Sequence, residues 1–331
     1  IGGLGILAIA VGALFMNGEV SVVTTLLLLS TMPVFIGGFG EDIGFSVAPK
    51  MRLLLSFLSA ATAGLLLDAW VTRSGIPFVD TALAFPLFAI AFTILMSGGI
   101  SHAINLIDGL NGLALGLSII MACSLAAISA KVGDTSLVVV CLLLAGSQMG
   151  VFVFNFPFGK IFLGDAGAYS IGHLLTWISI LLLVRNPEVA PFAVFLVFFW
   201  PVADMLFSIS RRIRNRKPID QPDRMHFHQF VMRAIALTLN TRRSISNPLA
   251  SVAIWPFAGI PVALAVMFYN SNTLAAALWV ACFCFFVWTY VAGIRLAKFL
   301  SRSRRTNETL VATINREGFS NVCSAVLKQR I

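Results

Sequence analysis

The sequence predicts an all-α, polytopic bundle of transmembrane helices. Hydrophobic residues make up 58% of the 331 residues and charged residues only 11%, a composition outside the range of ordinary soluble domains. Apolar runs of about 18 residues or more recur along the chain, and a helix of that length crosses the hydrocarbon core of a bilayer. The runs are continuous, whereas the strands of a membrane β-barrel alternate apolar and polar positions.

Ten apolar runs fit such helices, and polar segments separate them. In chain order the expected spans are 2–16, 19–36, 53–70, 82–97, 113–130, 136–154, 168–184, 191–209, 251–268 and 273–296. The chain begins at Ile1 within an apolar run, so we expect an eleventh, N-terminal span to be missing. We expect one transmembrane domain over residues 1–298 and a polar tail over 299–331, partly disordered near its end.

The basic residues predict the orientation. With ten spans, the polar segments 37–52, 97–112, 155–167 and 210–247 and the tail share one side. That side holds 20 of the 23 Lys and Arg residues, and such an excess marks the cytoplasm. The formal charge of +9 therefore needs no nucleic acid as a partner. The five cysteines form no CxxC pair, and four lie in apolar runs, so we expect core residues and not a zinc site or disulfides.

A polar stretch at the edge of the hydrocarbon carries Asn105, Asp108 and Asn111. Their spacing of three residues places them on one face if the stretch is helical. A carboxylate there is costly unless it meets water, a partner or an ion. The alternative interpretation is that Asp108 only caps a helix at the membrane edge.

Two further acidic segments are expected on the same side. Glu41 and Asp42 are adjacent acids followed by Lys50, and Asp165 lies among small residues at the expected start of a helix. Free N–H groups at a helix start can hold phosphate. Carboxylates hold Mg²⁺, which bridges phosphate oxygens, so the clustered acids suit a divalent metal and a phosphorylated substrate. The alternatives are a solvated turn at the first pair and an ordinary N-cap at Asp165.

The long basic segment adds His226 and His228. Two histidines without a third nearby ligand are weak evidence for a metal site. Asp204 is unusual at its depth in a span, and we expect it to pair with Arg211 or Arg212. Neither a G-x-S-x-G motif nor a Walker A motif occurs, which argues against a serine hydrolase and a P-loop enzyme.

Taken in order, these motifs resemble those of the polyprenyl-phosphate N-acetylhexosamine-1-phosphate transferases, the bacterial glycosyl transferases of the WecA, TagO and MraY type. Residues 105–112 resemble the family's N-x-x-D-G-x-D-G, and residues 155–167 resemble its N-x-P-A-x-I-F-M-G-D-x-G. Residues 201–228 resemble its P-x-x-D…R-R…D-R-x-H-x-H-H. The resemblance covers the chain up to about residue 298 and is nearer to the WecA and TagO branch.

Three positions depart from the family pattern. Glu41 stands where the family has the first Asp of a pair, Asn111 replaces a second Asp, and Gln229 replaces a His. Each keeps hydrogen-bonding capacity, while Asn111 and Gln229 lose a charge. The departures indicate a divergent subgroup or a member with reduced activity.

The resemblance implies transfer of a sugar 1-phosphate, an N-acetylhexosamine 1-phosphate in the family, from a UDP-sugar to polyprenyl phosphate, with release of UMP. It implies the cytoplasmic face of the bacterial inner membrane, and Mg²⁺ as cofactor, with Mn²⁺ as an alternative. Asp165 and Asp108 are the expected metal ligands. The implied catalytic residues are Asp42, Glu41, Asp108 and Asp165, and the implied substrate-binding residues are Asn105, Asn111, Asn155, Lys50, Arg224, His226 and His228.

Two other functions compete with this one. A transporter would place its acids near the middle of the bilayer and would show paired halves, which the sequence lacks. A family member without catalysis would survive as a lipid-binding or complex-binding membrane protein, an alternative that the three departures motivate.

Overall fold

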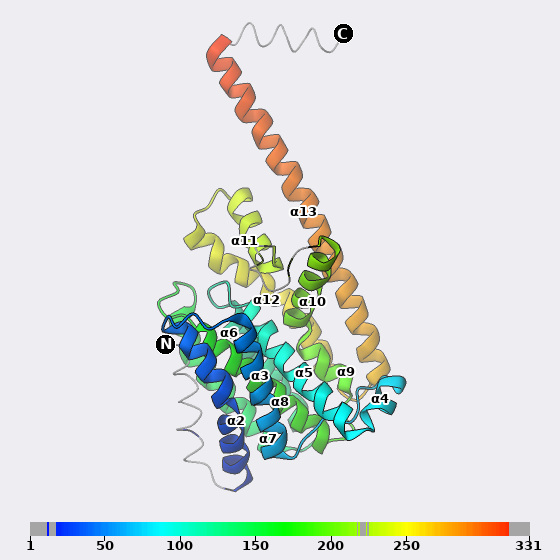
Figure 1. The fold of residues 1–331 in the computed structure, drawn as a ribbon. Coiled ribbons are helices and arrows are strands. Elements are labelled where there is room, and N and C mark those ends of the chain that lie inside the picture. Colours follow the sequence, from blue (N-terminus) through cyan, green and yellow to red (C-terminus); the bar gives the residue numbers. More distant parts are fainter. Residues whose placement is uncertain (1–11, 13–17, 217, 219–222, 224, 318–331) are drawn as a thin grey trace. The chain divides into compact units, whose positions relative to one another are not determined.

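The described part of the chain is helical throughout (Figure 1). The computed structural model describes residues 12, 18–216, 218, 223 and 225–317, with side chains described as far as Arg295. The helices are α2 (Glu19–Asp42), α3 (Pro49–Leu67), α4 (Pro77–Leu83), α5 (Pro86–Leu106), α6 (Leu113–Lys131), α7 (Thr135–Asn155), α8 (Gly164–Arg185), α9 (Pro191–Val197), α10 (Phe199–Arg214), α11 (Phe227–Thr238), α12 (Arg243–Met267) and α13 (Asn272–Glu317). They form two compact units, Ile1–Phe283 and Cys284–Ile331.

The prediction of a polytopic membrane bundle is confirmed. In the described residues, eight helices are long and apolar enough to cross a membrane, and α9 with α10 makes a ninth span if the bent pair is one span. These nine correspond to nine of the ten predicted spans. The remaining prediction, 2–16, lies outside the described residues apart from Gly12.

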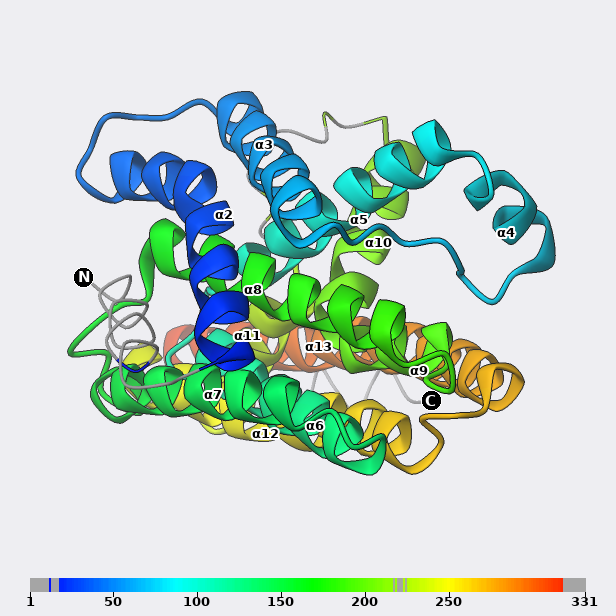
Figure 2. The ribbon, with the colours of Figure 1, turned by 90° about the horizontal axis from the view of Figure 1, so that it is seen from below.

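Helix α8 is the centre of the first unit. In α8, 89% of the most apolar 18-residue stretch is buried, against 28% in α3. Figure 2 shows α8 between a side that contains α3 and α5 and a side that contains α6, α7 and α12. Small residues allow the close approach: a Cβ on Gly172 would lie 2.7 Å from the Cα of Ser101 in α5. A packed helix of this kind places whatever its first turn carries inside the protein.

Several predicted boundaries are wrong because hydropathy marks the part of a helix inside the bilayer and not its end. Helix α2 continues to Asp42, and α5 continues to Leu106, so much of the predicted loops 37–52 and 97–112 is helix. The predicted loop 210–247 contains the end of α10 and all of α11. Asp108 does not cap a helix, since Gly112 is the N-cap of α6.

The predicted span 191–209 is broken. Helices α9 and α10 meet at Phe198 with a bend of 80°. Proline lacks the N–H for an α-helical hydrogen bond and its ring clashes with the carbonyl four residues earlier. Here that proline is Pro201 and that carbonyl belongs to Val197, the last residue of α9.

The predicted tail also differs from the structure. Helix α13 runs without a break to Glu317, so residues 299–317 continue the last helix.

The segments with the predicted chemistry lie at one end of the bundle. The C-terminal ends of α2, α5, α7 and α10 meet the N-terminal ends of α3, α6, α8 and α12 there, through hydrogen bonds described below. We call this the acidic end. At the opposite end, Arg73 donates to the carbonyls of Leu183, Asn186 and Val189 and joins the α3–α4 connection to the α8–α9 connection.

Candidate functional site

The end of α2 is joined directly to the start of α8. The backbone N–H groups of Asp165 and Ala166 donate to the two carboxylate oxygens of Asp42 at 2.8 and 3.1 Å. A Cβ on Gly38 would lie 2.5 Å from the Ala166 nitrogen, and a Cβ on Gly164 would lie 2.5 Å from an Asp42 oxygen. Gly164 also has a φ of +75°, which favours glycine. Two glycines therefore permit the contact between two of the predicted catalytic acids.

The Asp165 carboxylate receives two side chains from other helices. Asn105 in the last turn of α5 donates to it at 3.0 Å, and Arg52 in the first turn of α3 forms an ion pair with it. Both members of the ion pair are partly exposed, 18% and 24%. Sequence reasoning did not select Arg52 as a site residue, although a cation two residues after Lys50 at a predicted loop end was an available signal.

Asp108 lies in the turn between α5 and α6. Burial raises the pKa of Asp108 to about 7, and the negative charges of Asp165 and Asp42 raise it further in the same direction. The three acids therefore lie close enough to influence one another, as the order of motifs predicted. Asn105, Asp108 and Asn111 do not share a helix face, because the helix ends at Leu106.

Asn155 and Asn111 have partners within the protein. The Asn155 side chain is buried, accepts from Gly112 N–H at 2.6 Å and donates to the Ile161 carbonyl at 2.7 Å. The Asn111 side chain donates to the Pro157 carbonyl at 2.9 Å. These amides join the α5–α6 turn to the α7–α8 loop, so a substrate contact from either stays a prediction.

The two histidines pack around Asp204, which the sequence led us to pair with an arginine. Asp204 instead accepts from Phe227 N–H at 3.0 Å and lies 3.0 Å from His226 Nδ1 and 3.7 Å from His228 Nδ1. A Cβ on Gly109 would lie 2.5 Å from His228 Nε2. The prediction for Asp204 was therefore wrong, and His228 contacts the residue next to Asp108.

Arg211 pairs with Asp223 in place of Asp204. Burial by itself would raise the pKa of Asp223, but hydrogen bonds from Ser208 and the Met225 N–H, together with the Arg211 charge, hold it below its usual value. The pair joins the end of α10 to the segment that precedes α11.

Three predicted site residues have no such place in this network. Lys50 is exposed at the second residue of α3, and Arg224 lies outside the described residues. The Glu41 carboxylate has one buried oxygen, Oε2, without a hydrogen-bond partner among the residues that the structure describes.

The acids fit a metal that arrives with a phosphate better than a preformed metal cage. In the described residues no group of three His, Cys, Asp or Glu side chains could by itself hold a metal ion. Mg²⁺ commonly uses one or two protein carboxylates and completes its octahedral shell with water and substrate phosphates. Asp108 and Asp165 offer such carboxylates, and the unpartnered Glu41 oxygen leaves a further acceptor beside them.

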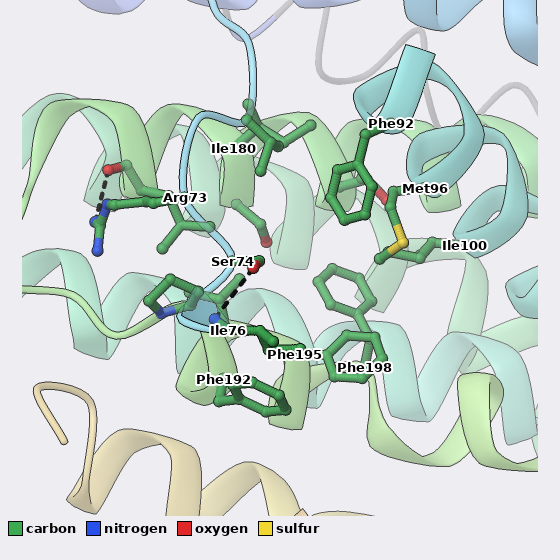
Figure 3. A pocket seen from close by; sticks show the side chains of 16 residues that line it. Arg73, Ser74, Ile76, Phe92, Met96, Ile100, Ile180, Phe192, Phe195 and Phe198 are labelled. Carbon is green, nitrogen blue, oxygen red and sulfur yellow. Dashed lines mark hydrogen bonds between the residues drawn. The ribbon is translucent and has the colours of Figure 1, made fainter. Parts of the chain in front are cut away.

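A cavity of about 240 Å³ lies among α5, α8, α9 and the α3–α4 connection, away from the acids. Its lining is almost wholly apolar. Figure 3 shows Phe92, Met96 and Ile100 of α5 on one side, Phe195 and Phe198 near the α9–α10 bend, and Arg73 at the far end. The cavity can hold a hydrocarbon group inside the bundle.

Fold and site together define a multi-pass membrane protein with convergent acids, an arginine and histidines at one end of a helical bundle. Residues 24–183 match the sequence model of glycosyl transferase family 4. This segment contains all four predicted catalytic acids, and through it the chain belongs to glycosyl transferase family 4. The histidines and α12 lie beyond the matched segment.

Two relatives have descriptive names. A "probable undecaprenyl-phosphate N-acetylglucosaminyl 1-phosphate transferase" of Bacillus subtilis (strain 168) is 31% identical over 208 residues, which cover 62% of this chain and 56% of that protein. A "phospho-N-acetylmuramoyl-pentapeptide-transferase" of Staphylococcus aureus (strain bovine RF122 / ET3-1) is 31% identical over 157 residues, which cover 47% of this chain and 48% of that protein. The chain thus spans about half the length of the curated relatives it matches.

Proposed function

We propose that the protein transfers a sugar 1-phosphate from a UDP-sugar to a polyprenyl phosphate at the cytoplasmic face of a bacterial inner membrane. An oxygen of the acceptor phosphate forms a bond to the phosphorus that carries the sugar. The bond from that phosphorus to the bridging oxygen breaks, and the electron pair leaves with UMP. The observation that carries the proposal is the convergence of Asp42, Asp108 and Asp165 at one end of the bundle.

The acids and cations divide the work by their surroundings. Asp42, with Glu41 beside it, would orient the acceptor phosphate and take its remaining proton. Asp165 and Asp108 would hold a divalent cation, Mg²⁺ in our proposal and Mn²⁺ as the alternative, which neutralises charge on the diphosphate. Arg52 contacts Asp165 already and can turn to a phosphate oxygen. Positioning and charge neutralisation supply most of the catalysis of phosphoryl transfer.

Other residues would bind the donor and acceptor. Asn105 reaches the Asp165 carboxylate, and the predicted donor contacts are Asn111, Asn155, Lys50, Arg224, His226 and His228. We propose that the apolar cavity takes part of the polyprenyl chain. Ile100 in its lining precedes Asn105 by five residues, or roughly 7.5 Å along the helix axis. Burial of a lipid chain contributes about 0.8 kcal/mol for each CH₂ group.

The test is the release of UMP from a panel of UDP-sugars with undecaprenyl phosphate, measured on membranes that contain the chain. Asp165→Asn should abolish release, because it removes a charge on which both the cation and Arg52 depend. Asp68→Asn is the matched control: Asp68 is exposed at the end of α3 away from the acids, and its left-handed φ of 47° suits asparagine.

Release from no donor, or equal release by Asp165→Asn and wild type, would overturn the proposal. Magnesium-dependent nucleotide binding without release would favour the alternative of a member that has lost catalysis. The acids lie at helix ends and not along the spans, so no observation favours a transporter.

A further inference from the structure

The turn that carries Asp108 needs support from outside the matched segment. Only residues 107–112 separate α5 from α6. Buried backbone N–H and C=O groups in such a turn must find partners, because an unpaired group costs free energy. The partners of this turn decide where the Asp108 carboxyl lies.

Helix α12 supplies two of those partners. Asn247 accepts a hydrogen bond from the Asn111 N–H through its Oδ1 at 2.8 Å. Ser251 donates from its Oγ to the Asn111 carbonyl at 2.8 Å and is fully buried. Asn247 and Ser251 are four residues apart, so they share one face of α12. Both backbone groups of a residue three positions after Asp108 are thus bonded to a single helix face.

The α7–α8 loop holds the other side of the turn. The Asn111 side chain donates to the Pro157 carbonyl, and Gly112 N–H donates to Asn155 Oδ1. An aspartate at position 111, as in the family motif, has no donor for the Pro157 carbonyl. The Asn111 departure therefore fits a turn held by backbone contacts from both sides.

We propose that Asn247 and Ser251 are positioning residues for sugar-1-phosphate transfer, which hold the α5–α6 turn so that Asp108 faces Asp165 and Asp42. This inference rests on the proposed function. Neither residue needs to touch a substrate. Without the Asn247 acceptor, the Asn111 N–H lacks a partner and the turn is free to move, so the carboxyl leaves the geometry that the transfer requires.

The variant Asn247→Leu removes the acceptor with little change in volume, and Asn247→Asp keeps it. In the UMP-release assay, Asn247→Leu should lower kcat by about tenfold or more, since misplacement by about 1 Å can cost about 100-fold. The KM for the UDP-sugar should stay within about twofold, because phosphate and nucleotide contacts remain. Asn247→Asp should restore most of the lost kcat.

Asn272→Leu is the matched control. Asn272 also bonds backbone groups, accepting from Phe192 N–H at 3.1 Å and donating to the Gly75 carbonyl at 3.0 Å, but at the end opposite the acids. A merely structural role for Asn247 predicts the same result for both variants. An equal loss of kcat in Asn272→Leu and Asn247→Leu, or a wild-type kcat in Asn247→Leu, overturns the inference.

Hydrogen exchange separates this inference from the proposed function. Peptides that cover residues 105–115 should exchange faster in Asn247→Leu than in wild type, Asn247→Asp and Asn272→Leu. Unchanged exchange in Asn247→Leu overturns the inference whatever the activity. If the wild type releases no UMP from any donor, the proposed function fails, while faster exchange in Asn247→Leu still supports the hold of α12 on the turn.

Discussion

Replacing Asp42 by asparagine should weaken the contact between α2 and α8 and slow the transfer. The Asp42 carboxylate accepts from the N–H groups of Asp165 and Ala166 at the N-terminus of α8, where the helix dipole favours negative charge. Asparagine keeps one acceptor oxygen and carries no charge, so one of the two N–H groups loses its partner.

The magnitude follows from these two losses. Removal of a capping acceptor costs about 1 kcal/mol, and removal of a charge at a helix end costs about 0.3–1 kcal/mol. Because Asp42 is exposed and water screens its charge, we expect a total of about 1–1.5 kcal/mol. At roughly 2–4 °C for each kcal/mol in a domain of about 150–250 residues, the thermal midpoint should fall by about 2–6 °C.

The assay is thermal unfolding of the purified protein in detergent, with UMP release measured below both midpoints. Glu19→Gln is the control, since Glu19 pairs with Arg185 at 2.8 Å at the other end of α2 and is 61% exposed. An exposed pair contributes about 0–1 kcal/mol, so this midpoint should hardly change. An Asp42→Asn protein with wild-type midpoint and wild-type rate would refute the reasoning, and so would an equal fall in Glu19→Gln.

Two further predictions concern the same end of the bundle. Gly38→Ala places a Cβ 2.5 Å from the Ala166 nitrogen, so α2 and α8 must separate, at a cost of about 1–3 kcal/mol. Gly99→Ala in α5 meets nothing within 4 Å and should be neutral or stabilising in the same unfolding measurement; similar midpoints for both variants would contradict the close contact. The pKa of Asp108 is raised to about 7, so between pH about 4 and 7 the folded protein keeps a proton that the unfolded chain has lost. Stability should therefore fall as pH rises through that window, by at most about 1.4 kcal/mol for each pH unit, and Asp108→Asn should lose this component. Unfolding midpoints at about pH 5 and about pH 8, without divalent cations, check the sign; parallel pH profiles for wild type and Asp108→Asn would disprove it.

Hydropathy and motif order predicted much of this fold and of its candidate site. Continuous apolar runs located the spans, since the bilayer requires about 20 apolar residues whatever packs beside them. Counting spans then assigned the segments around Asp42, Asp108 and Asp165 to one side, and the structure brings those segments to one end of the bundle. The start of α8 near Asp165 was also readable, because small residues precede a long apolar run.

The partners of these side chains were not readable. Asp204 lies in a span followed by arginines, and its sequence neighbours suggested an ion pair, yet folding brings His226 against it. Arg52 and Asp165 are 113 positions apart, and Asn111 and Asn247 are 136 apart. Local pattern carries no information at such separations.

The sequence by itself determined the class of protein, the number of spans in the described part and the side on which the acids lie, because each depends on local hydrophobicity and on counting. Only the tertiary structure decided which groups bond to Asp165, where the span at Phe198 bends and that α12 holds the Asp108 turn. Those features depend on how closely two helices pack, and that distance is set by glycines such as Gly38 whose neighbours lie on another helix.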